Sequence, residues 1–328
     1  MTRKILFACV LVVTLIATTL EPAQAHGLIG KRFLPATLAI DDPFVADELS
    51  LPTIFHIQRR GSEESAQTRE TDLSGEFSKR LSPDLGFSLG GTFKILDPDP
   101  GTSVSGFDNL EVALKYVFFK SEAHEMLLSL GLSWDVGGTG SKKVDAESFS
   151  TWTPSLFFGK GFGDLPDQLD LLKPLAVTGA LGWAVPSRIH TKTFETAEDG
   201  EVEVKKPLNP TVFKWGFSFQ YSLQYLQSYV RDVGLPAPLN RMIPIVEVAL
   251  ETPIDGRDAA HTTGTVNPGI IWFGRYFQLG LEAVIPINAA SGKNVGVLAQ
   301  MHFYLDDILP QIFTWTPFHG VLGPTQPR

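Results

Sequence analysis

Three features that many proteins rely on are scarce or missing here, and each absence removes a class of function. Cys9 is the only cysteine and lies in a segment that we expect to be removed, so the mature chain has no disulfide, cysteine-based metal site or cysteine nucleophile. The formal net charge is −9, which argues against nucleic-acid binding. Beyond residue 25 there is no uncharged apolar run of about 20 residues, which argues against helical membrane spans but not against a membrane barrel.

The first 25 residues have the pattern of a secretory signal peptide. Arg3 and Lys4 form a basic start, Ile5–Leu20 is an apolar run, and Ala23–Ala25 is a small-x-small cleavage site. The mature chain should therefore begin at His26 and be exported. Residues 1–25 carry one net positive charge, so the mature chain has a net charge of −10.

The rest of the chain contains twelve segments in which apolar and polar residues alternate, the period of a β-strand with two different faces. Most are longer than the usual soluble strand of about 5–6 residues and match the roughly 9–11 residues that a tilted strand needs to cross a bilayer. The expected spans are 52–60, 69–80, 84–96, 107–119, 125–137, 149–161, 173–186, 210–224, 242–252, 264–274, 276–287 and 293–305.

The connections and the tryptophans indicate how these strands are arranged. Short turns alternate with long polar loops, as in outer-membrane barrels, where the short turns face the periplasm. Trp134, Trp152, Trp183 and Trp215 all fall near the long-loop end of their strands, as expected for an aromatic girdle at a membrane interface. We therefore predict an all-β fold, a transmembrane antiparallel up-and-down β-barrel of about 12 strands with both termini in the periplasm.

The polar face of these strands should point into the barrel lumen. Its charged residues are candidates for a channel lining, although an internal network that plugs the barrel is the alternative. The intermediate width of a twelve-stranded barrel favours the channel. Both signs of charge occur, so no ion selectivity is predicted. The candidates are Glu76, Lys94, Glu111, Lys115, Asp135, Lys214, Glu247, Glu251, Glu282 and His302.

Catalytic and metal sites have weaker support. None of the seven histidines is followed closely by a nucleophile in a recognisable local arrangement, so we expect no enzyme of the Ser–His–acid type. As a new N-terminus, His26 would offer an amine and an imidazole that could chelate Cu²⁺, but any residue tolerated after an export site is the more ordinary interpretation. We expect no cofactor and no other metal.

Two stretches of the chain resemble a known family. The strand GFDNLEVALKYVFF and the closing segment NVGVLAQMHFYLDD, together with the AQA-HG signal end, resemble Gram-negative outer-membrane barrels of the transporter type, most of all the family named for the MetA pathway of phenol degradation. The resemblance implies a barrel that moves small, often hydrophobic or aromatic, compounds. Many such barrels end on an aromatic residue that the assembly machinery reads, whereas residues 306–328 follow the last strand here. Either Phe303 or Phe313 supplies that signal, or this tail folds back under the barrel.

The sequence thus predicts a signal peptide (1–25), an extended N-terminal periplasmic segment (26–51), a barrel (52–305) and a C-terminal tail (306–328). The leading hypothesis is a channel or transporter for passive movement of small molecules across the outer membrane, reached by export through the periplasm. A structural or surface-display barrel is the alternative, and a barrel enzyme is the third. The expected partners are outer-membrane lipid and lipopolysaccharide, the barrel-assembly machinery and a small-molecule solute, without nucleic acid.

Overall fold

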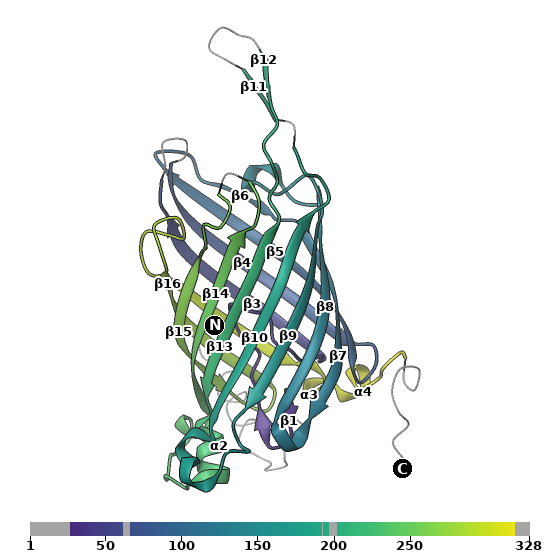
Figure 1. The fold of residues 1–328 in the computed structure, drawn as a ribbon, viewed down its shortest axis with the longest axis vertical. Coiled ribbons are helices and arrows are strands. Elements are labelled where there is room, and N and C mark those ends of the chain that lie inside the picture. The colour runs from purple at the N-terminus through teal and green to yellow at the C-terminus, as the bar shows by residue number, and fades with distance from the viewer. Residues whose placement is uncertain (1–26, 62–65, 192, 197–201, 257, 319–328) are drawn as a thin grey trace, which may run out of the picture.

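The computed structural model describes residues 27–61, 66–191, 193–196, 202–256 and 258–318. The predicted signal peptide, the copper hypothesis at His26 and the end of the predicted tail, residues 319–328, lie outside the described residues. In the described part of the chain, no helix is long and apolar enough to cross a membrane. Long strands dominate instead and form a tall barrel (Figure 1).

Twelve long strands pair antiparallel with their neighbours in sequence, and the last pairs with the first, so the sheet closes. This confirms the predicted fold class, an antiparallel up-and-down barrel of 12 strands. A short strand, β6 (Val104–Phe107), adds to the edge of β5 next to β7. The long strands are β3 (Glu48–Arg59), β4 (Gln67–Arg80), β5 (Leu85–Asp99), β7 (Leu110–Ser121), β8 (Met126–Val136), β9 (Thr151–Gly161), β10 (Leu175–Pro186), β13 (Val212–Tyr221), β14 (Met242–Pro253), β15 (Thr263–Phe273), β16 (Phe277–Pro286) and β17 (Gly296–Tyr304).

The alternation of residues along each strand separates an apolar outer face from a polar inner face. On β7 the outward residues Leu110, Leu114 and Tyr116 are exposed on the barrel surface. The outward tryptophans Trp134 and Trp152 are register partners on β8 and β9, and their rings stack with centroids 5.0 Å apart. A continuous apolar belt of this kind is the surface that a barrel presents to lipid.

The two ends of the barrel differ. At one end, called here the long-loop end, the hairpin of β11 (Thr193–Thr196) and β12 (Val202–Lys205) projects beyond the strands (Figure 1). The other, short-turn end carries the short helices α2 (Leu223–Tyr225), α3 (Leu305–Ile308) and α4 (Pro310–Phe313) (Figure 1). The remaining short helices are η1 (Glu122–His124), η2 (Lys142–Val144), η3 (Asp167–Leu172), η4 (Leu226–Val230) and η5 (Leu239–Arg241).

Most strand ends lie within three residues of their predicted bounds, and two of the differences have clear local causes. β3 begins at Glu48 rather than at residue 52, because the pairing with both neighbours skips Leu51 and Pro52 in a bulge and then resumes at Thr53. A proline that cannot donate to the ladder is tolerated at a bulge. The segment predicted as 107–119 is divided at residues 108–109, where the chain passes from β6 to β7.

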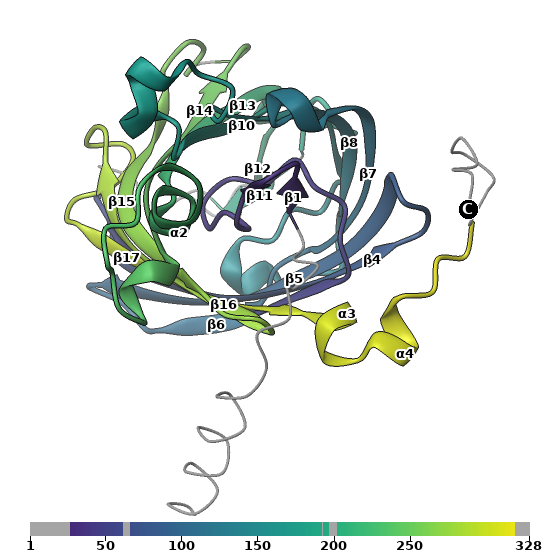
Figure 2. The same cartoon turned by 90° about the horizontal axis from the view of Figure 1, so that it is seen from below.

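The chain before β3 lies inside the barrel instead of beyond its end. Residues 27–47, the N-terminal segment, form a small hairpin of β1 (Leu28–Ile29) and β2 (Arg32–Phe33) and then an irregular stretch. Seen from the short-turn end, this segment crosses the interior of the ring of strands (Figure 2). The sequence predicts an extended periplasmic arm for residues 26–51, whereas residues 27–47 lie in the lumen (Figure 2). The N-terminal segment can therefore contribute side chains to the site inside the barrel.

Candidate functional site

Glycines on the inner face of the strands make room for the N-terminal segment. At three of them a Cβ atom would come within about 2.6 Å of a side chain of the segment, which is closer than a real contact allows. These glycines are therefore required by the close approach of the segment to the wall. The pairs are Leu38 with Gly280, Ile40 with Gly216, and Val45 with Gly86.

Glu247 on β14 holds the centre of the segment. Its carboxylate accepts hydrogen bonds from the backbone N–H groups of Leu38, Ala39 and Ile40, at 2.8, 2.9 and 3.2 Å. Three successive N–H groups that converge on one carboxylate form an anion-binding nest. The Glu247 side chain is fully buried, so these bonds replace its lost hydration.

Further contacts fix both sides of this central stretch. On one side, the Gln278 amide donates to the carbonyl of Ala36 at 2.7 Å. On the other, the Lys115 ammonium forms an ion pair with Asp41 at 2.7 Å and also donates to the carbonyl of Asp42 at 2.6 Å. The segment is thus bonded to strands on several sides of the barrel.

The segment ends at β3 with a second buried acid. Asp47 is fully buried and forms ion pairs with Lys79 and Arg80 of β4, both at 2.7 Å. Both bases lie at the last two positions of β4. The point where the N-terminal segment becomes a barrel strand is therefore held by charge as well as by the strand ladder.

At the short-turn end, Arg32 anchors the start of the segment. Its guanidinium is buried, pairs with Glu125 at 3.0 Å and donates to the carbonyl of Pro174 at 2.8 Å. It also lies 3.8 Å from the ring centroid of Tyr225, whose hydroxyl donates to Glu125 at 2.9 Å. Burial lowers the pKa of Arg32 and raises the pKa of Tyr225 to about 12, so the phenol of this cluster is neutral at neutral pH.

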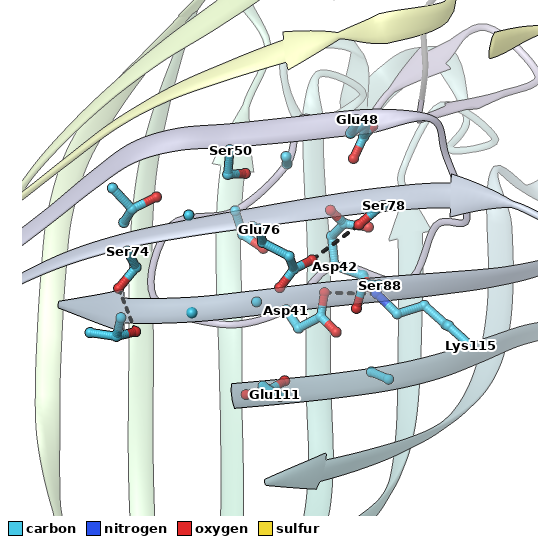
Figure 3. A pocket seen from close by; sticks show the side chains of 18 of the residues that line it. Asp41, Asp42, Glu48, Ser50, Ser74, Glu76, Ser78, Ser88, Glu111 and Lys115 are labelled. Carbon is cyan, nitrogen blue, oxygen red and sulfur yellow. Dashed lines mark hydrogen bonds and ion pairs between the residues drawn. The ribbon is translucent and has the colours of Figure 1, made fainter. Parts of the chain in front are cut away.

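Two adjoining cavities of about 570 and 540 Å³ lie beside the N-terminal segment. Ala39, Ile40 and Asp41 contribute to the lining of both, so the segment forms part of each wall. Figure 3 shows acidic side chains of the segment and of the strands gathered around the first cavity.

Three carboxylates lie in one row across the wall of these cavities. Glu76 on β4 is the register partner of Gly90 on β5, Gly90 is the partner of Glu111 on β7, and Glu111 is the partner of Asp135 on β8. With no side chain at Gly90, the carboxylates on either side share one open space, visible for Glu76 and Glu111 in Figure 3. Among the described residues, neither Glu111 nor Asp135 forms an ion pair.

The basic side chains around the cavities all have acidic partners. Lys115 pairs with Asp41 as described above, Arg59 pairs with Glu70 at 2.6 Å, and Lys214 lies 3.7 Å from Glu251. These three lysine and arginine side chains, together with His302, stand against nine acidic residues in the linings of the two cavities. The nine are Asp41, Asp42, Glu48, Glu76, Asp108, Glu111, Asp135, Glu147 and Glu251.

Most of the predicted lumen residues fall at these cavities. Those in the linings are Glu76, Glu111, Lys115, Asp135, Lys214, Glu251 and His302. Lys94 instead pairs with Asp108 at 2.6 Å. Glu247 and Glu282 are buried and line neither cavity. Asp41 and Asp42 also line the first cavity but are not among the predicted lumen residues.

A polar cluster that sequence spacing did not reveal joins β3 to β17. The Ser50 hydroxyl lies 2.8 Å from Nδ1 of His302, and Nε2 of the same ring lies 3.2 Å from the Glu48 carboxylate. All three side chains line the first cavity. Because 252 positions separate Ser50 from His302, only the closure of the barrel brings them together.

Comparison with known proteins supports the fold. No protein-family model matches the chain, and no curated protein matches it either. Among solved structures, the COG4313 outer membrane channel from Pseudomonas putida F1 has a TM-score of 0.50 at 12% identity, covering 87% of this chain and 98% of that chain. The fold is that of an outer-membrane β-barrel.

Two other solved barrels align less well. The NanC porin has a TM-score of 0.41 at 8% identity, covering 77% of this chain and 98% of that chain. The β domain of the Bordetella autotransporter BrkA has a TM-score of 0.45 at 12% identity, covering 79% and 98%. At identities this low, likeness describes architecture, and function has to be argued from the site.

Proposed function

We propose that this protein is an outer-membrane channel for the passive movement of small solutes, and that its own N-terminal segment narrows the path. The observation that carries the proposal is the pair of polar cavities inside a closed barrel, walled on one side by a segment bonded to the strands. Solutes would cross by displacing or passing this segment. The short-turn end would face the periplasm, as the short turns of such barrels do.

The lining favours small polar or cationic solutes. Nine acidic residues against three paired lysine and arginine side chains create a negative field inside a low-dielectric wall, which concentrates cations and repels anions. The resemblance to the family named for the MetA pathway of phenol degradation implies aromatic solutes. This resemblance rests on the strand motifs of the sequence. Beside its acidic groups, the lining contains aromatic side chains such as Phe87, Phe149 and Phe157, which offer apolar contact to such solutes.

Conductance and solute uptake test the channel together. Protein refolded into planar bilayers should give discrete current steps, and in liposomes it should admit small cations and neutral polar solutes faster than anions of equal size. The assay panel should include an aromatic hydrocarbon, a cationic amine, a neutral sugar and a carboxylate. Folded protein that passes neither ions nor any member of the panel contradicts the proposal while leaving the barrel intact.

A second candidate function rests on the cluster of Ser50, His302 and Glu48. A hydroxyl next to an imidazole that is oriented by a carboxylate is the order of groups in a serine hydrolase, although a hydrolase also needs donors for an oxyanion. A fluorophosphonate probe distinguishes the two functions. Labelling of the native protein that disappears in the Ser50→Ala variant favours the enzyme, and an unlabelled protein favours a structural network in the channel wall.

A further inference from the structure

The chain after the last strand, β17, turns from the barrel wall onto the outer surface of the barrel. Helices α3 and α4 lie outside the ring of strands at the short-turn end (Figure 2). The ring of Phe313 packs against that of Phe77, with centroids 6.1 Å apart. Phe77 has the same parity on β4 as Leu73, which is exposed on the outer face, so the tail rests on the side of the barrel that carries the apolar belt.

Polar contacts fix the tail to the rim of the barrel. The Arg80 guanidinium pairs with Asp306 at 2.6 Å. The Lys79 ammonium donates to the carbonyls of Phe313 and Trp315, at 3.1 and 2.7 Å. The backbone N–H of Phe318 donates to the carbonyl of residue 81 at 2.8 Å. The Asp306 carboxylate and several backbone groups of the tail are therefore bonded to the barrel and do not face the surroundings of the protein.

Most exposed side chains between residues 308 and 318 of the tail are apolar. Trp315 is 66% exposed and Ile312 is 61% exposed, and residues 308–318 contain no charged side chain. A contiguous apolar surface of this kind usually marks an interaction site. The other exposed apolar residues of the tail are Ile308, Leu309 and Phe318.

We propose that this surface, formed by Ile308, Leu309, Ile312, Trp315 and Phe318, lies in the headgroup region of the phospholipid leaflet at the short-turn end. The argument is continuity, because the contact of Phe313 with Phe77 makes the tail an extension of the belt that faces lipid. Amphipathic segments rich in aromatic and aliphatic residues bind at this depth, and tryptophan is enriched there. The inference does not depend on whether the barrel conducts.

A fluorescent probe on the tail tests this placement in the full chain. Cys9 is the only native cysteine, so a variant with Cys9→Ser and Ile312→Cys carries one label, such as NBD. A matched variant carries the label at the exposed position Lys143 of the long-loop end, through Lys143→Cys. Both proteins are refolded into phosphatidylcholine vesicles that contain nitroxide lipids labelled either near the headgroup or deep in the acyl chain.

The expected result is a blue-shifted probe at position 312 that shallow nitroxides quench at least twofold more than deep ones, with a water-like probe at position 143. A water-like probe at position 312, or stronger quenching by the deep label, overturns the proposal. If the labelled tail disturbs folding, the native Trp315 supplies a second measurement. Lipid brominated near the headgroup should quench the tryptophan fluorescence of the native protein, and this quenching should decrease in Trp315→Phe. Equal quenching in the two proteins overturns the proposal.

Discussion

Replacing Glu247 should release the N-terminal segment while leaving the backbone ladder of β14 with its two neighbouring strands intact. In Glu247→Ala, the N–H groups of Leu38, Ala39 and Ile40 lose their common acceptor. Hydrogen bonds to a charged group each contribute about 1.5 kcal/mol at the low end, or roughly 4.5 kcal/mol for three. Relief from burying a carboxylate offsets part of this, so we take a net loss of about 3 kcal/mol.

A loss of about 3 kcal/mol corresponds to a shift of roughly a hundredfold in the equilibrium between bound and released segment. If the bound segment narrows the path, the open probability of single channels should rise by that factor, up to saturation. Glu247→Gln keeps one acceptor oxygen and should have a smaller effect. Single-channel recording in planar bilayers measures the change, after a heat-modifiable gel shift confirms that each barrel has folded.

The matched control is Glu251→Gln, because Glu251 lies on the same strand and lines a cavity but pairs with Lys214 and makes none of the contacts to the N-terminal segment described above. We expect its open probability to match that of the native protein. Equal open probabilities for the native protein, Glu247→Ala and Glu251→Gln would refute the reasoning, because they would mean that the N-terminal segment does not limit conduction.

Three further predictions concern other charged groups. Replacing Arg32 by methionine leaves Glu125 buried without its cation, a change that costs about 3–5 kcal/mol, so the midpoint of heat-modifiable migration should fall, and an unchanged midpoint would contradict the anchor. Glu111→Gln combined with Asp135→Asn should move the reversal potential in a KCl gradient toward zero, whereas a native channel that already prefers anions would oppose the acidic-lining argument. Burial raises the pKa of Asp306 to about 6, above its unfolded value near 3.9, so docking of the tail should strengthen as pH falls through about 6 and weaken above it. A fluorescent probe on the tail should therefore show higher anisotropy at pH 5 than at pH 8. If this difference persists in Asp306→Asn, the carboxyl of Asp306 is not its origin.

The strands could be predicted because their signal is local. Along β7, the spacing of Leu110, Leu114 and Tyr116 alone predicts an outer face. Once the outer face of a strand is known, its pairing register with the neighbouring strands is restricted. Strand ends were less predictable where a bulge intervened. The first strand is predicted from residue 52, yet β3 begins at Glu48, because its pairing resumes on the other side of the bulge at Leu51 and Pro52.

The position of the N-terminal segment could not be predicted because nothing in its sequence is periodic. Its partners are far away in the chain: Glu247 lies 207–209 positions from the N–H groups it holds. The glycines on the inner faces of the strands did carry a signal. They alternate with the outward apolar residues, and Gly216 and Gly280 are the places where Ile40 and Leu38 meet the wall.

The same pairing changes how the charge of the lumen should be understood. By composition, the inner face of the barrel carries both positive and negative side chains, which predicts no ion selectivity. In the folded barrel, Lys115 is neutralised by Asp41, which belongs to the inserted segment and not to the wall. The N-terminal segment, which we propose narrows the path, thus also pairs with this lysine, whereas neither Glu111 nor Asp135 forms an ion pair among the described residues. The proposed narrowing of the lumen and the proposed preference for cations are therefore linked. A variant that releases the N-terminal segment should leave Lys115 without Asp41, so it should raise the channel current and weaken the preference for cations over anions.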